Sequence, residues 1–198
     1  ANLGNANLGN ANLGNANLGN ANLESANLWN AHLGNANLQN ASLQYANLAY
    51  ANLGNANLGN ANLENAYLWN ANLAYAYLES ANLENAYLWN ANLENAYLWN
   101  ANLQRANLQG ANRGNAYLEN ANLTYAYLGS ANLAYANLAY AYLGNIQVDA
   151  FSNFQGANLT GAYGLPETLN TKAKFIAAVR ANNVNAETIW IDGTSILS

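Results

Sequence analysis

The sequence predicts an all-β solenoid whose chain turns a corner every five residues, followed by a small helical cap. From residue 1 to residue 145, the 198-residue chain is an unbroken run of 29 pentapeptides of the form Ala-Asn-Leu-x-x. Hydrophobic residues make up 52% of the chain and charged residues only 8%, about a third of the usual share, which indicates a biased and repetitive sequence with enough apolar surface for a core. The last part, residues 162–198, departs from the repeat.

The spacing of the apolar residues decides the kind of fold. Ala opens all 29 pentapeptides and Leu holds the third position in 28 of them, while Asn holds the second position in 20 and Tyr in seven. A period of five fits neither an α-helix nor a strand, and on a helix or coiled coil it would carry Leu around every face. We therefore expect Ala and Leu to point inward on each short side, with Asn, Gly and Ser as turn residues.

With this motif the chain resembles the pentapeptide-repeat proteins, whose fold is a right-handed quadrilateral β-helix with four pentapeptides per coil. The resemblance covers residues 1–145 without a gap, and two further units, 152–156 and 157–161, follow in a register displaced by one residue. We therefore expect one extra residue within 146–151, as a bulge. The repeat domain would span residues 1–161 as about eight coils, a column roughly 38 Å long.

Residues 162–198 are expected to form a carboxyl-terminal cap, because repeat proteins need their ends covered. Pro166 ends the repeat, and the segment 171–181 is predicted to be a short amphipathic helix. Asn182-Asn183 predicts a turn, and residues 188–191 a short strand. The apolar side chains expected to close the column are Phe175, Ile176, Val179 and Trp190.

The amino-terminal coil, residues 1–20, has no comparable covering segment in the sequence, and the absence of an initiator Met suggests a mature form or a fragment. We expect this end to be covered by a second copy, by a different protein or by a further segment. A two-fold homodimer is favoured over a head-to-tail stack, since the carboxyl-terminal cap blocks propagation. The leucines expected to be exposed there are Leu3, Leu8, Leu13 and Leu18.

Arg113 is the one residue that breaks the Leu pattern, between Leu93 and Leu133 of the same side. An unpaired guanidinium inside the column would be very unfavourable, so we expect Arg113 to turn outward with local distortion. Two interpretations remain, a tolerated defect of the repeat and an anchor for an anionic partner, of which the first is favoured.

Aromatic residues at outward positions are the most informative deviation from the motif, because nothing in the fold requires them there. Tyr67, Tyr77, Tyr87 and Tyr97 recur every ten residues and should alternate between two opposite sides. Such bands suggest contact with a partner, a carbohydrate or a membrane interface. Equally, stacked rings can stabilise neighbouring coils by themselves. The candidate interaction surface comprises Trp29, Tyr67, Trp69, Tyr77, Tyr87, Trp89, Tyr97, Trp99 and Tyr117.

Catalytic, cofactor and metal sites are not expected. The chain has no Cys, one His and two Asp, and His32 is about six coils from Asp149, so neither a catalytic triad nor a metal cluster can form within the column. Glu64 and Glu84 should lie on successive coils at a separation that retaining glycosidases use, but on a flat exposed side without a cleft. The sequence has no run of 18 consecutive apolar residues, so it does not predict a transmembrane helix.

The leading functional hypothesis is a non-catalytic structural or protein-interaction module. The resemblance implies one alternative, since some members of the family mimic DNA and bind type II topoisomerases such as gyrase. Residues 1–145 carry six Glu and two Arg over several sides, which is weakly acidic for that role, and a nucleic-acid partner is not expected either. A second alternative is carbohydrate binding on Trp29, Trp69 and Trp89. The family's abundance in cyanobacteria suggests such a source.

Overall fold

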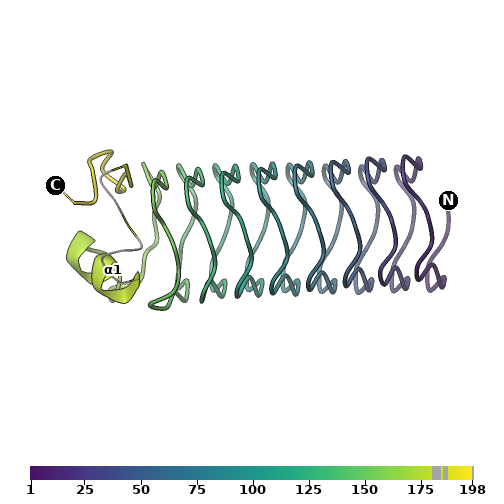
Figure 1. Cartoon of the computed structure of the whole chain (residues 1–198), viewed down its shortest axis with the longest axis horizontal. Coiled ribbons are helices and arrows are strands. Elements are labelled where there is room, and N and C mark those ends of the chain that lie inside the picture. Colours follow the sequence, from purple (N-terminus) through teal and green to yellow (C-terminus); the bar gives the residue numbers. More distant parts are fainter. Residues whose placement is uncertain (180–183, 185–186, 198) are drawn as a thin grey trace.

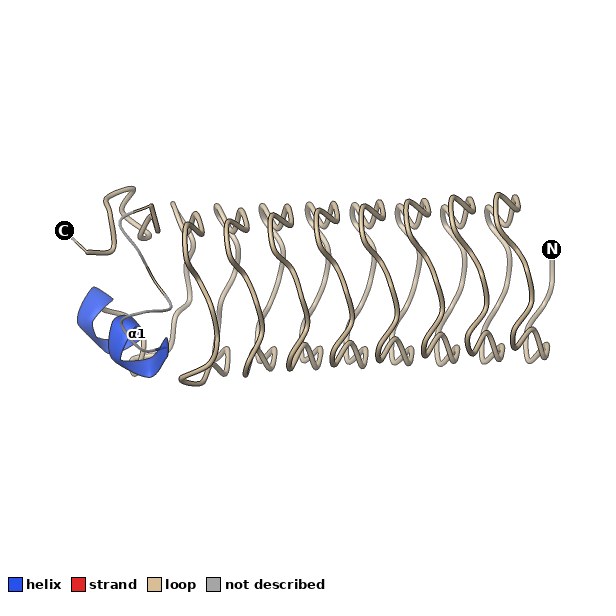
Figure 2. Ribbon diagram, in the orientation of Figure 1, coloured by secondary structure: helices blue, strands red, loops and turns tan. Residues whose placement is uncertain are grey.

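The computed structural model describes residues 1–179, 184 and 187–197. The chain forms an elongated column of regularly stacked coils with its two termini at opposite ends, and the colour changes steadily along the column as the sequence advances (Figure 1). Helix α1, Lys172–Val179, lies at the carboxyl-terminal end (Figure 2). The coils are drawn as loops because each side contributes isolated bridge residues instead of a longer strand.

Parallel backbone bridges join each second-position residue to the residue 20 positions later, as in Asn2 with Asn22 and Asn22 with Ser42. One coil therefore contains four pentapeptides, one for each side. We name the sides by the pentapeptides of the first coil: the first, second, third and fourth sides begin at residues 1, 6, 11 and 16. The third side runs through eight layers, at Asn12, His32, Asn52, Asn72, Asn92, Asn112, Asn132 and Asn153.

The core is a stack of layers along the axis of the column, and each complete regular coil contributes one Ala and one third-position residue, almost always Leu, from each of its four sides. From Ala21 to Leu143, every first-position Ala and every third-position Leu is at most 1% exposed. Full burial of a Leu side chain contributes on the order of 1.5–3 kcal/mol before the loss of conformational entropy is counted. Each coil contacts mainly its two neighbours, so this stabilisation accumulates along the column.

The corners explain why Asn dominates the fifth position. There the backbone turns with a positive φ, for example 59° at Asn5 and 56° at Arg105. Asn tolerates this left-handed region better than other non-glycine residues, whereas a bulky side chain there costs roughly 1–2 kcal/mol. Tyr nevertheless occupies several corners, at Tyr45, Tyr50, Tyr75, Tyr125, Tyr135 and Tyr140. The first-position N–H closes each corner by donating to the Leu carbonyl, as from Ala6 to Leu3 at 3.0 Å.

Asn at the second position makes two kinds of hydrogen bond. Its Oδ1 accepts from the N–H two residues later, as Asn52 does from Gly54 at 3.1 Å. Its Nδ2 donates to the Asn one coil earlier, as Asn72 does to Asn52, also at 3.1 Å. The third side carries such a ladder through Asn92, Asn112, Asn132 and Asn153. The repeated Asn therefore pins each corner locally and joins neighbouring coils.

The register changes once, in the last complete coil. Tyr127 still pairs with Gln147, 20 residues later, but Asn132 pairs with Asn153, 21 residues later. The extra residue is accommodated by Asp149, whose carboxylate accepts from Ser130 N–H at 2.8 Å and from Phe151 N–H at 2.9 Å. In regular coils the N–H equivalent to that of Ser130 donates to a backbone carbonyl, so here the Asp149 side chain replaces the main chain.

The surroundings of Asp149 act on its ionisation in opposite directions. Partial burial favours the neutral form, but donation from the Ser130 and Phe151 N–H groups and from the Ser152 and Ser130 hydroxyls lowers the pKa of Asp149 below its ordinary value. Ser152 is buried and also donates to the Leu128 carbonyl at 2.9 Å. The bulge is thus held by an ionised carboxylate.

Arg113 corrects the expectation from the sequence, because its side chain is buried, with no exposed surface, inside the column. The backbone is not distorted there: Arg113 N–H donates to the Asn132 carbonyl at 2.7 Å, as in every regular coil. The Nε, Nη1 and Nη2 atoms have no hydrogen-bond acceptor among the described residues. Desolvation by burial lowers the pKa of Arg113 to about 9. The backbone hydrogen bonds to the preceding and following coils keep the Cα–Cβ bond pointing inward, so the guanidinium lies inside the column.

At the carboxyl-terminal end, α1 packs on the last coil through aromatic contacts. The Phe175 ring is buried between Phe154, at 4.9 Å, and Trp190, at 5.4 Å, both edge-on. The helix begins one residue later than predicted, because Thr171 Oγ1 accepts from Lys174 N–H at 3.2 Å in the manner of an N-cap. Described helical structure ends at Val179. The predicted last turn to residue 181 and the predicted turn at 182–183 lie outside the described residues.

The segment 187–197 adds backbone pairing to the same end. Ile189 bridges Asn158 in parallel and Ser195 in antiparallel orientation, within the segment predicted to be a strand. The Leu159 N–H donates to the Ile189 carbonyl at 2.8 Å, which satisfies a backbone group of the last coil. Of the helices in the described part of the chain, none has the length and apolar character that crossing a membrane requires.

The first coil is less enclosed than the others. Leu3, Leu8 and Leu13 are half-buried and pack against the core, whereas Leu18 is buried, at 8% exposed. The expectation of four exposed leucines is therefore wrong for Leu18, which is buried, and is met only in part by the three half-buried leucines.

Candidate functional site

The aromatic residues selected from the sequence fall on two sides of the column. Five of them lie on the second side: Trp29, Tyr67, Trp69, Tyr87 and Trp89. The other four lie on the fourth side: Tyr77, Tyr97, Trp99 and Tyr117. With four sides to a coil, these two sides are opposite each other.

The second side carries a nearly continuous row of large rings. Tyr50 lies 6.3 Å from Trp29 and 6.3 Å from Trp69, and Trp69 lies 5.1 Å from Trp89, measured between ring centroids. Sequence reasoning missed Tyr50, because it occupies a corner position, where the motif indicates only a turn. The repeated Tyr at corner positions was the signal that could have revealed it.

A second row of rings runs alongside the first, and Tyr67 and Tyr87 stack within it at 5.2 Å with planes only 9° apart. We call the two rows together the aromatic band. Trp29, Tyr50, Tyr67 and Tyr87 are between 41% and 51% exposed, while Trp69 and Trp89 are half-buried. The Trp69 Nε1 atom is buried and has no hydrogen-bond acceptor among the described residues. The aromatic band thus presents ring surface to solvent while its central Trp residues are held in place.

The fourth side carries a more self-contained cluster. Tyr77, Tyr97 and Tyr117 stack on successive coils at 4.9 and 5.1 Å, with planes 7° and 5° apart. Trp99 packs against Tyr97 at 5.2 Å and against Tyr117 at 5.8 Å, and both Tyr97 and Trp99 are half-buried. Tyr77 and Tyr117 remain 49% and 37% exposed, while the close stacking of the four rings fits coil-to-coil stabilisation.

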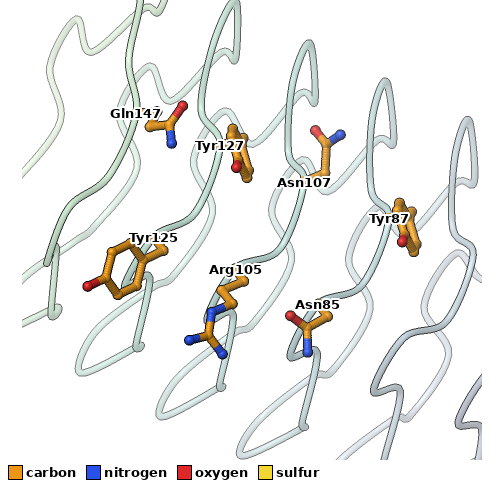
Figure 3. A pocket seen from close by; sticks show the side chains of 7 residues that line it. All are labelled: Asn85, Tyr87, Arg105, Asn107, Tyr125, Tyr127 and Gln147. Carbon is orange, nitrogen blue, oxygen red and sulfur yellow. The ribbon is translucent and has the colours of Figure 1, made fainter.

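The aromatic band is interrupted by a recess at the pentapeptide 106–110. A hollow of about 440 Å³ lies at the corner between the first and second sides, and its lining includes Tyr87, Asn107 and Tyr127 (Figure 3). A second hollow reaches Asn107, Gln109 and Gly110 from the opposite corner, and a third reaches Gln109. We call this feature the recess, defined by Asn107, Gln109 and Gly110. Asn107 stands where both neighbouring coils carry a ring, Tyr87 and Tyr127, and Gln109 stands where the preceding coil carries Trp89.

Residues considered for chemistry do not converge on a cleft. Glu64 and Glu84 lie on adjacent coils of the first side, where Glu64 accepts from Asn65 and Glu84 lies 3.7 Å from Arg105. His32 is exposed on the third side, and its Nδ1 lies 3.3 Å from Asn52 Nδ2, in line with the Asn ladder. Within residues 1–179, 184 and 187–197 there is no group of three or more His, Cys, Asp or Glu that could hold a metal ion.

The repeat register and the Ala–Leu core define a solenoid built from pentapeptides, and comparison of the sequence with family models agrees. The model of the pentapeptide repeats matches residues 1–112 and 114–146 in overlapping segments, leaving out Arg113. The chain belongs to the pentapeptide repeat family, whose members are right-handed quadrilateral β-helices that generally act as non-catalytic structural repeats. Among curated proteins, no sequence matches the chain.

Solved structures resemble the chain over most of its length. HetL, a pentapeptide repeat protein involved in heterocyst differentiation regulation in the cyanobacterium Nostoc sp. strain PCC 7120, is 34% identical with a TM-score of 0.68; the match covers 81% of this chain and 75% of HetL. A pentapeptide repeat protein of the Arabidopsis thaliana thylakoid lumen is 27% identical with a TM-score of 0.52, covering 56% of this chain and 74% of its own.

Proposed function

We propose that this protein is a non-catalytic interaction module that binds a protein partner through the aromatic band of its second side. The observation that carries the proposal is the row of rings from Trp29 through Tyr50 and Trp69 to Trp89. Outward positions of the repeat are free to be Asn or Gly, so the fold does not require large rings there. Aromatic residues, above all Trp and Tyr, are the residues that most often carry the energy of protein interfaces.

The relatives support a regulatory interaction more than a reaction. HetL, the relative described above, is involved in the regulation of heterocyst differentiation, and we infer that this chain acts by presenting a surface. Polysaccharide, ester and phosphate substrates should not be turned over above background. The test measures hydrolysis by the wild-type chain and by Glu64→Gln and Glu84→Gln; turnover that either substitution abolishes would contradict the proposal.

The two other functions considered from the sequence receive less support. A saccharide-binding platform needs exposed ring faces in a common plane, but the Trp69 and Trp89 planes are tilted by 58° and both rings are half-buried. A DNA mimic needs a dense row of acidic side chains. Here the six Glu residues of the repeat lie on three sides: Glu24, Glu64 and Glu84 on the first, Glu94 on the third, and Glu79 and Glu119 on the fourth.

We further propose that the column is a right-handed β-helix of about eight coils in residues 1–161 and that residues 162–198 are its cap. The stack of Phe154, Phe175 and Trp190 and the pairing of Asn158 with Ile189 support this role for the cap. At the other end, the half-buried Leu3, Leu8 and Leu13 favour a homodimer formed through the first coil.

The aromatic band is tested by returning it to the residues usual in the repeat. A variant carrying Trp29→Gly, Tyr67→Asn and Tyr87→Asn keeps the motif, because Gly and Asn occur at the equivalent positions of other coils. A matched control carries Tyr77→Asn and Tyr117→Asn on the opposite side. Proteins crosslinked to the wild-type chain in cells of its source should be lost with the first variant and retained with the control. Equal loss, or no loss, in both variants would refute the assignment to this band.

A further inference from the structure

The Tyr row of the second side lacks one ring. Tyr67 and Tyr87 stack on each other, the next coil carries Asn107, and the coil after it carries Tyr127. Figure 3 shows the Tyr87 and Tyr127 rings nearly edge-on, one on each side of Asn107 along the column. Their faces therefore look toward the space above Asn107, which belongs to the hollow of about 440 Å³.

The fourth side of the same protein shows what fits such a space. There Tyr97 lies between Tyr77 and Tyr117 at 4.9 and 5.1 Å, nearly parallel to both. Tyr87 and Tyr127 are also two coils apart, so their rings are separated by about 10 Å at the usual spacing of neighbouring strands. A single ring centred between them would lie about 5 Å from each, inside the range of favourable aromatic pairs. The gap therefore has the width of one ring.

The groups around this gap select the charge of a ligand. Arg105 lies on the corner next to it, 54% exposed, with its guanidinium carbon 5.8 Å from the centre of the Tyr125 ring. Its ion pair with Glu84, at 3.7 Å, lies at the surface, with the Glu84 side chain 29% exposed, and a surface pair contributes little. Arg105 can therefore pair with an incoming carboxylate. The rest of the lining is amide-rich, with Asn85, Asn107 and Gln147.

The shape of the recess favours an extended peptide. Asn107 also lines a second hollow, at the next corner of the same side, together with Trp89, Asn90, Gln109, Gly110 and Ser130. Gly110 lacks a side chain, and the Asn90 amide lies in the space that a Cβ there would take. Two hollows that flank Asn107 and present amide side chains suit a peptide backbone, which needs both donors and acceptors.

We propose that the recess binds an extended, acidic peptide segment of a protein partner, with one aromatic side chain inserted between Tyr87 and Tyr127 and an adjacent carboxylate paired with Arg105. This inference rests on the proposed function and deepens it by naming the chemistry of the partner. The inserted ring completes the interrupted Tyr row, and Asn107 and Gln109 bind the peptide backbone.

Three blocked tripeptides test the proposal by NMR on the whole chain. Acetyl-Asp-Tyr-Asp-amide contains both features, acetyl-Asp-Leu-Asp-amide lacks the ring, and acetyl-Asn-Tyr-Asn-amide lacks the charge. The first peptide should bind at least about tenfold more tightly than the peptide without the ring, because two ring pairs are formed. Its Tyr ring protons should shift upfield, since the bound ring lies between two ring faces.

Substitutions to residues that the repeat already uses at the equivalent positions locate the binding site. Asn107→Tyr should fill the gap, weaken binding at least about tenfold and leave the chain at least as stable as wild type. Asn47→Tyr is the matched control, because it adds a Tyr next to Tyr67 on the same side, away from the recess. Tyr127→Asn removes one wall and gives a second test should Asn107→Tyr fail to fold. Arg105→Asn should remove the preference for the acidic peptide over the neutral one.

The outcomes separate this proposal from the broader one. Equal binding of the Tyr and Leu peptides, no upfield shift, or unchanged affinity in both Asn107→Tyr and Tyr127→Asn would overturn the ring site. Failure of every peptide to bind at millimolar concentration would also overturn it. The proposed function would still stand in those cases if the variant of Trp29, Tyr67 and Tyr87 lost its crosslinked partner while the control kept it.

Discussion

Replacing Arg113 by Leu should stabilise the protein strongly. Burial lowers the pKa of Arg113 from its ordinary value, well above 9, to about 9. At ~1.4 kcal/mol per pH unit, this difference corresponds to about 5 kcal/mol of destabilisation at pH 7, where the guanidinium is charged in both the folded and the unfolded chain. Leu removes the buried charge and restores the residue found at this position in the other 28 pentapeptides.

The sign of the pH dependence follows from the lowered pKa of a cation. Below about pH 9 the folded chain carries the full penalty. As the pH rises above 9, the folded state loses the proton before the unfolded state does, and the penalty shrinks by ~1.4 kcal/mol per pH unit. The stability gap between Arg113→Leu and wild type should therefore be about 2 kcal/mol smaller at pH 10.5 than at pH 7. The two proteins differ only at residue 113, so contributions from the rest of the chain cancel in the difference.

The assay is guanidinium unfolding at the two pH values, followed by far-UV circular dichroism and by Trp fluorescence, whose transitions must coincide for a free energy to be assigned. Leu53→Arg is the reciprocal control, because Leu53 is equally buried on the same third side, and it should destabilise by a comparable amount. The reasoning would be refuted if Arg113→Leu were no more stable than wild type, or if the stability difference between the two proteins did not change with pH.

Three further predictions concern the bulge and the two ends. Asp149→Asn should lower the free energy of unfolding by about 1–3 kcal/mol near neutral pH. This loss should disappear as the pH falls through the lowered folded-state pKa of Asp149, and acid titration of both proteins followed by circular dichroism measures it. Phe175→Ala should cost about 3–5 kcal/mol and loosen the cap first, seen as faster hydrogen exchange at Leu159 than at Leu63; uniform exchange would contradict a separate cap. The 198-residue chain should sediment as a dimer that Leu3→Glu with Leu13→Glu dissociates, and a monomer at high concentration would argue against pairing through the first coil.

Much of the column could be predicted because each pentapeptide meets the same local demands. A small and a branched apolar residue must point inward, and an Asn must accept a hydrogen bond from the N–H two residues later. Residues close in sequence meet both requirements, so the requirements appear in the sequence as a period of five. The aromatic candidates were likewise visible, since a ring at an outward position stands out against Asn. Tyr50 was not among the predicted residues, because it occupies a corner that is defined by its positive φ, and the motif does not show the backbone angle.

Other features depend on what a side chain meets in the neighbouring coil. Arg113 was expected outside on the cost of burying charge, but the backbone bonds to the coils on both sides hold its Cβ inward, and that constraint exists only in the assembled column. The sequence set Asp149 apart only by its distance from His32; its role in the bulge depends on the shifted register, which leaves the Ser130 N–H facing its carboxylate.

Four features could be read from the sequence, because they follow from composition and from contacts within five residues. They are the repeat, the inward Ala and Leu, the place of the extra residue and the small number of catalytic groups. The directions and contacts of the outward side chains were visible only in the tertiary structure, which joins Trp29 to Trp69 through Tyr50 and leaves a gap between Tyr87 and Tyr127. The physical reason is that stacking and burial depend on side-chain direction at residues 20 apart, which local chemistry does not specify.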